Sequence, residues 1–149
     1  MSWANQAVYK LIIALPDDAL KAYATDPDWT VGEILRHIAS SSGGYGARLK
    51  GSDAEVLVRP KTMQELQAIA KQLLSNDAEL LVLADIADEK MTVIREGETT
   101  PWMRSTIVTQ AIHHATEHRA QAVSALEAKG FKAVNLDDYD VWAYEINNG

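Results

Sequence analysis

The sequence predicts an all-α protein built as a four-helix bundle, and three observations support this prediction. Apolar residues recur at spacings of three and four along four segments, near 2–15, 30–49, 62–87 and 104–129. Two of these segments begin with a helix-capping pattern, and the last one ends at a glycine. Alternation suited to strands is confined to a short stretch, so we expect no sheet larger than a hairpin near 91–103. A chain of 149 residues has the length of one domain, spanning 1–149.

The first two segments have clear helix signals. Segment 2–15 carries its apolar residues mostly three or four apart, and Pro16 ends it. The second segment begins at Thr30, which forms a capping box with Glu33 three residues later. Serines and glycines fill 40–44 and are poor helix formers. We interpret that stretch as part of the same helix, where small residues let another backbone approach closely.

The second half of the chain predicts two further long helices and a short one. The third segment starts with another capping box, Thr62 to Glu65, and its apolar stripe continues to residue 86. The fourth ends at Gly130, a residue type typical of the position just after a helix. The connections 51–61 and 91–103 are long enough to allow crossovers. The tail is rich in apolar and aromatic residues, so we expect it to pack as a short final helix; these are Leu136, Tyr139, Val141, Trp142 and Ile146.

Composition excludes several classes of partner and site. Fourteen Lys and Arg against 21 Asp and Glu give a net charge of −7, so neither nucleic acid nor an anionic membrane is an expected partner. No apolar run reaches the length of a membrane span and the first residues lack signal-peptide features, so we expect a cytoplasmic protein. The chain has no cysteine, which excludes thiolate metal sites and cysteine catalysis. A metal ion would have to be held by histidines and carboxylates.

Histidines form the one pattern that points to chemistry. Three of the 4 histidines lie within the fourth segment. His114 and His118 are four residues apart, so on a helix they share a face with Cβ atoms about 5–6 Å apart. Two imidazoles at this spacing can converge on one divalent ion. His113 is rotated by about 100° from His114 around the helix, so we expect it to point away from that ion.

The remaining histidine, His37, could complete the site from another helix. Its spacing from Val31 and Ile34 places it near the core side of the second segment. If the second and fourth helices are neighbours, three imidazoles would surround one ion and leave a position open for water or substrate, as in catalytic sites. The histidine pattern alone is also compatible with two other interpretations. A histidine beside an apolar face is commonly a hydrogen-bonded core residue, and a four-apart pair can be a solvated surface pair.

Other conspicuous residues have structural interpretations. We interpret the tryptophans as packing anchors, namely Trp3, Trp29, Trp102 and Trp142. Arg119, which follows His118, is interpreted as an ion-pair partner. The chain contains no glycine-rich phosphate loop, no Ser-His-Asp signature and no dinucleotide-binding fingerprint.

Two segments of the sequence resemble the DinB/YfiT-like superfamily. The first is WTVGEILRHI at 29–38, and the second is HATEHRAQ at 114–121, where Ala120 stands in place of the family's usual glycine. The resemblance covers nearly the whole chain in the order of its elements. It implies a four-helix bundle with crossover topology, a divalent ion (most commonly zinc or nickel) on His37, His114 and His118, and a homodimer.

The resemblance implies activity less specifically than fold. Some relatives are thiol S-transferases that use bacillithiol, mycothiol or glutathione, and others are maleylpyruvate isomerases. We therefore expect a metal-dependent enzyme with a small-molecule substrate. Activation of a low-molecular-weight thiol would make it a thiol S-transferase, and activation of water would make it a hydrolase. The alternative is a non-catalytic dimeric module, for small-ligand binding or protein interaction, that retains the bundle and the histidines.

Overall fold

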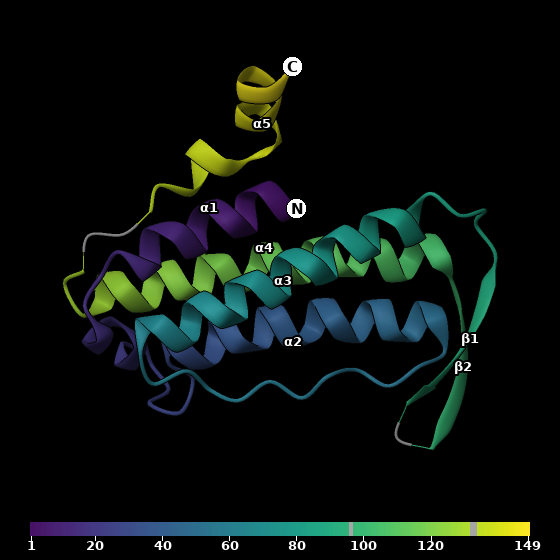
Figure 1. The fold of residues 1–149 in the computed structure, drawn as a ribbon, viewed down its shortest axis with the longest axis horizontal. Helices are drawn as coiled ribbons and strands as arrows, with labels where there is room; N and C mark the ends of the chain where they lie inside the picture. Colours follow the sequence, from purple (N-terminus) through teal and green to yellow (C-terminus); the bar gives the residue numbers. More distant parts are fainter. Residues whose placement is uncertain (96, 132–133) are drawn as a thin grey trace.

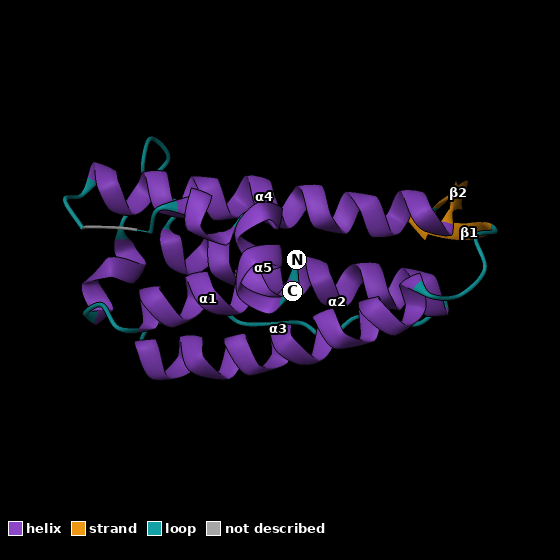
Figure 2. Ribbon diagram, turned by 90° about the horizontal axis from the view of Figure 1, so that it is seen from above, coloured by secondary structure: helices purple, strands orange, loops and turns teal. Residues whose placement is uncertain are grey.

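Four long helices lie along one common axis in the computed structural model, which describes residues 1–95, 97–131 and 134–149 (Figures 1 and 2). They are α1 (Ser2–Ile13), α2 (Val31–Lys50), α3 (Met63–Ala84) and α4 (Arg104–Ala128). Short 3₁₀ turns, η1 (Asp17–Lys21) and η2 (Leu136–Tyr139), follow α1 and precede the last helix, α5 (Val141–Asn148). The predicted all-α fold class is confirmed.

The bundle has a crossover between its second and third helices. The connection after α2 runs back along the length of the bundle, so α2 and α3 point in the same direction (Figure 1). Helix α2 packs against both α3 and α4, whereas α1 packs mainly against α3. This arrangement confirms that the connection 51–61 is a crossover, and it makes α2 and α4 neighbours.

A hairpin joins α3 to α4 at one end of the bundle (Figure 1). Strands β1 (Lys90–Arg95) and β2 (Glu98–Met103) pair antiparallel, with Lys90 opposite Met103 and Arg95 opposite Glu98. The predicted hairpin at 91–103 is therefore confirmed, although residue 96 of its turn lies outside the described residues. Gly97 has a φ of 82°, which glycine tolerates without the steric cost that other residues meet.

The helix ends follow the capping signals with two differences. Thr30 and Thr62 accept hydrogen bonds from the backbone N–H of Glu33 and Glu65, at 3.4 and 3.2 Å. The reciprocal half of the box does not form at Glu33, whose carboxylate instead pairs with a neighbouring arginine. Helix α3 ends at Ala84 rather than near 87, because the chain turns there toward the hairpin.

The small residues of α2 make room for side chains of α3, whereas the sequence predicts the close approach of another backbone. Residues 40–44 continue the helix without interruption. A Cβ atom at Gly43 would lie 2.9 Å from Asn76 Nδ2 on α3, so the Asn76 side chain would have to shift. That same Asn76 amide donates to the Ala39 carbonyl at 3.1 Å. Around this contact the core is apolar, and its largest fully buried members include Tyr9, Ile12, Leu35, Ile38, Leu66, Leu73 and Leu126.

A polar network crosses the core and takes one buried side chain from each long helix. Asp77 of α3 accepts from Ser42 Oγ of α2 at 2.7 Å and from Asn5 Nδ2 of α1 at 2.9 Å. Arg119 of α4 donates through Nη1 to Asn5 Oδ1 at 2.6 Å. Arg119 is therefore linked to Asp77 through Asn5, which refines its interpretation as an ion-pair partner.

The tail differs most from its prediction. Helix α5 forms, and Tyr144 packs edge-on against Trp3 with ring centroids 5.5 Å apart. Val141, Trp142 and Ile146 nevertheless stay 77, 73 and 83% exposed. The expectation that the whole apolar tail packs against the bundle is wrong for these three side chains, because α5 stands away from the bundle and contacts it along one side (Figure 1).

None of the helices in the described part of the chain combines the length and apolar character that crossing a membrane requires.

Candidate metal centre

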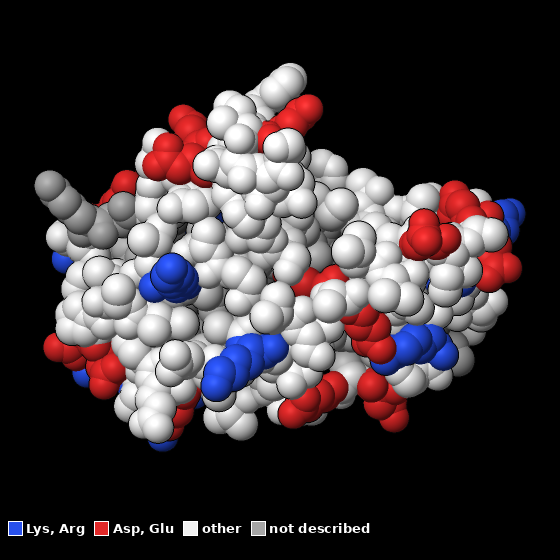
Figure 3. All heavy atoms as spheres, turned by 45° about the horizontal axis from the view of Figure 1, so that its top comes forward, with Lys and Arg blue, Asp and Glu red and all other residues white. Residues whose placement is uncertain are grey.

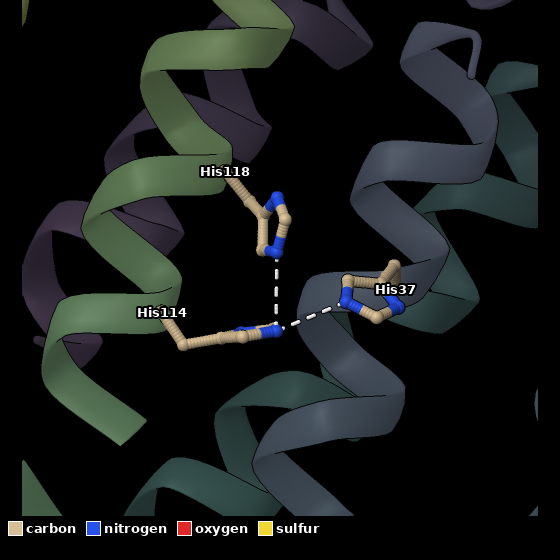
Figure 4. A group of neighbouring side chains, drawn as sticks. All are labelled: His37, His114 and His118. Carbon is tan, nitrogen blue, oxygen red and sulfur yellow. Dashed lines mark hydrogen bonds between the residues drawn. The ribbon is translucent and has the colours of Figure 1, made fainter. Parts of the chain in front are cut away.

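Three histidines meet between α2 and α4. His37 comes from α2, and His114 and His118 come from successive turns of α4, with their rings directed toward one another (Figure 4). His114 Nε2 lies 3.0 Å from His37 Nε2 and 3.1 Å from His118 Nε2. One nitrogen from each ring lies within 4.8 Å of the others. The chain thus brings together two segments that are 77 positions apart.

Local sequence explains why α2 and α4 come close enough for this meeting. Four of the nine buried residues of α4 are alanines, a residue type that keeps helix surfaces narrow and lets helices approach. The two α4 histidines are one turn apart and face α2, as the four-residue spacing predicts. His113 is exposed on the same helix and lies outside the cluster. That it plays no part in metal binding stays a prediction.

Aromatic rings surround the cluster. The Trp29 ring lies edge-on to both His37 and His118, with centroid distances of 5.2 and 5.6 Å. Tyr45 of α2 lies edge-on to His114 at 5.8 Å. These contacts restrict the rotation of all three imidazoles and reduce their access to water.

Gln121 links the histidine cluster to Trp29. Gln121 Oε1 lies 2.8 Å from His118 Nδ1, and the Trp29 indole N–H donates to the same oxygen at 2.9 Å. The nitrogen of His118 that faces away from the cluster is therefore already hydrogen-bonded. Such outer contacts hold imidazole ligands in place in metalloproteins.

Burial and mutual proximity favour the neutral form of the imidazoles. The pKa of His37 is lowered, first by burial and then by the nearby His118. The pKa of His114 falls from 6.5 to about 4, because burial and the two neighbouring rings all disfavour a further positive charge. Both rings therefore offer lone pairs rather than charges near neutral pH, and lone pairs are what a metal ion requires.

A family model described as the DinB family matches residues 1–147. The chain belongs to the DinB family. This match confirms the resemblance that the sequence segments around His37 and His118 indicate. A search of the curated proteins gave no match.

The chemistry of the donor set in this DinB protein suits a transition-metal ion. Among the described residues, the cluster offers three imidazole nitrogens and contains no carboxylate. Imidazole ligands favour zinc, nickel and copper over magnesium and calcium, which prefer oxygen. The three-histidine group could therefore hold one divalent ion. Whether the protein carries an ion, and which one, stays a prediction.

The sequence does not predict a role in the site for three residues that lie in it, namely Trp29, Gln121 and Tyr45. Trp29 is predicted only as a packing anchor, whereas here it contacts two of the histidines. Gln121 follows His118 by three positions on the same helix face, so that spacing was the available signal. Tyr45 had no signal beyond its place on the apolar face of α2.

Proposed function

We propose that this DinB-family protein is a metal-dependent enzyme in which His37, His114 and His118 bind one divalent ion. Zinc and nickel are the ions best matched to three imidazoles. The observation that carries the proposal is the convergence of three Nε2 atoms from two helices. A structural histidine needs only one hydrogen-bond partner. This arrangement instead places His114 Nε2 within 3.0 and 3.1 Å of two other imidazole nitrogens, all of which are potential metal ligands.

The proposed reaction is activation of a nucleophile on a small-molecule substrate. A bound ion lowers the pKa of a water or a thiol in contact with it, which supplies a nucleophile near neutral pH. Trp29 and Tyr45 would contact the apolar part of the substrate and keep bulk water away. We rank a thiol S-transferase that uses a low-molecular-weight thiol above a hydrolase, and family membership is the support for that ranking.

The charge beside the site supports an anionic substrate. The Arg48 guanidinium lies over the Tyr45 ring at 5.2 Å from its centroid. It is near enough to His114 to contribute to the lowered pKa of that imidazole. A fixed positive charge at this position suits an anionic group such as a carboxylate.

A second candidate function is a non-catalytic dimeric module, and one observation favours it. A broad uncharged area of the surface lies between groups of acidic side chains (Figure 3). Exposed apolar residues of α3 and α5 contribute to that face, namely Leu81, Val141 and Tyr144. We propose that the protein forms a homodimer in either case, since a second copy would remove this apolar surface from water.

Metal analysis of protein purified without an affinity tag tests the enzyme proposal. We expect about one zinc or nickel ion per chain in the wild type, and none in His114→Ala, because two remaining imidazoles make an incomplete site. Loaded protein would then be screened for transfer of several low-molecular-weight thiols to electrophiles. Wild-type protein that neither retains nor binds zinc or nickel would contradict the proposal and favour the non-catalytic module.

A further inference from the structure

We infer that Gln121, oriented by Trp29, is a positioning residue that fixes the tautomer of His118, so that its Nε2 faces the other histidines without a proton. The inference deepens the proposed function and depends on it for its catalytic meaning. The tautomer itself is a property of the metal-free protein. It can therefore be tested whether or not the protein is an enzyme.

The first step is the orientation of the Gln121 amide. An amide presents an oxygen that accepts hydrogen bonds and a nitrogen that donates them, and the two have nearly the same shape. The indole nitrogen of Trp29 can only donate. It lies 2.9 Å from one atom of the Gln121 amide, so that atom must be the carbonyl oxygen, Oε1. Trp29 thereby decides which way the amide faces.

The orientation of the Gln121 amide in turn sets the tautomer of His118. The same Oε1 atom lies 2.8 Å from His118 Nδ1. Because Oε1 accepts only, the hydrogen of this bond must come from the imidazole, and Nδ1 carries the proton. In the neutral ring the lone pair is then on Nε2. This is the atom that lies 3.1 Å from His114 Nε2 inside the cluster (Figure 4).

These contacts also join the two helices that carry the histidines. Trp29 immediately precedes the N-cap of α2, and α2 carries His37. Gln121 lies on α4, one turn after His118. Within the described residues, His37 and His114 have no hydrogen-bond partner at Nδ1. His118 is thus the ring whose tautomer is set before any ion arrives, and Gln121 is the residue that sets it.

The test replaces Gln121 by residues that keep or remove the acceptor. Gln121→Met has a similar length and no strong acceptor, Gln121→Glu keeps an oxygen that accepts from both donors, and Trp29→Phe removes the donor that orients the amide. For each protein, NMR of the imidazole nitrogens without metal, at mildly alkaline pH, reports which nitrogen of His118 carries the proton. Competition with a chelator then gives the affinity for Zn²⁺ alone, and circular dichroism confirms folding.

We expect His118 to be protonated at Nδ1 in the wild type and in Gln121→Glu, and to populate both tautomers in Gln121→Met. Affinity for Zn²⁺ should fall by about 10–100-fold in Gln121→Met, less in Trp29→Phe, and be retained in Gln121→Glu. A wild-type His118 protonated at Nε2 would overturn the inference. So would an unchanged tautomer and unchanged Zn²⁺ affinity in Gln121→Met. If the wild type binds no Zn²⁺, the proposed function fails, while the NMR result still decides the tautomer.

Discussion

Two groups of polar side chains lie between the helices, and they differ in whether their members satisfy one another. The network around Asp77 joins four helices and pairs every donor it uses with an acceptor, and it combines a cation with an anion. The histidine cluster joins two helices and brings together three bases without an acid. The first group is complete without a ligand. The second brings His114 Nε2 within 3.0 and 3.1 Å of two other imidazole nitrogens, and a single imidazole nitrogen can satisfy only one of these contacts as a donor or an acceptor.

This difference supports a structural role for the first group and the proposed ion-binding role for the second. Buried polar groups are costly unless they are paired, so the Asp77 network is expected to specify how the four helices pack. The histidines are only partly buried, and the pKa values of His37 and His114 are lowered rather than raised. Neutral bases held close together are the form that a cation would stabilise. The comparison therefore makes different predictions for the two groups.

The largest effect is expected from breaking the closed network. Arg119→Met removes the buried cation and leaves Asn5 Oδ1 without its donor and Asp77 without the nearby positive charge. We expect the free energy of unfolding to fall by about 3–5 kcal/mol, measured by urea denaturation. The exposed Glu117→Gln on the same helix is the matched control and should change stability little. A loss below about 1 kcal/mol for Arg119→Met would show that the network is not needed for packing.

A smaller effect is expected from titrating the open cluster in the absence of metal. The pKa of His114 is about 4 in the folded protein against 6.5 in the unfolded chain, and that of His37 is also lowered. Between these values the unfolded chain binds more protons than the folded protein. The contribution of these imidazoles to the free energy of unfolding is therefore complete above about pH 6.5 and decreases as the pH falls toward 4.

Urea denaturation across this pH range measures that decrease. The double variant His37→Gln/His114→Gln is the control and should lose less stability on acidification. The difference between the two proteins isolates the imidazoles from Asp77, whose pKa is raised by burial and which acts in the opposite direction. Parallel pH profiles for the two proteins would contradict the assignment of lowered pKa values to the cluster.

The smallest effect is expected at the histidine that lies outside both groups. His113 is exposed and points away from the cluster, although it is adjacent to His114 in the sequence. His113→Gln should therefore leave both the metal content and the stability unchanged. Loss of the ion in this variant, measured by elemental analysis, would mean that the helix face is assigned one residue out of register.

The sequence predicts the helices, the hairpin and the histidine cluster well, because each depends on local spacing. Capping boxes and apolar periodicity locate the starts of α2 and α3, and a four-residue spacing places His114 and His118 on one face. Joining His37 to that pair required the two helices to be neighbours, which spacing alone does not reveal. The family resemblance supplied that neighbour relation.

Contacts between distant segments are what the sequence could not predict. Trp29 and Gln121 are 92 positions apart, and nothing in either neighbourhood indicates that they share a hydrogen bond. The exposure of Trp142 was also unpredictable, because apolar composition shows that a segment favours burial but not which surface covers it. Residues whose role depends on a contact between distant segments can be identified only from the three-dimensional structure.

The central claim is that the open cluster binds one divalent ion through all three imidazoles. X-ray absorption spectroscopy at the metal edge, on protein loaded with one equivalent of Zn²⁺, tests it most directly because it reports the atoms around the ion. We expect scattering from three imidazole rings in the wild type and from two in His37→Ala. A wild-type spectrum dominated by oxygen, or one unchanged by His37→Ala, would contradict the claim.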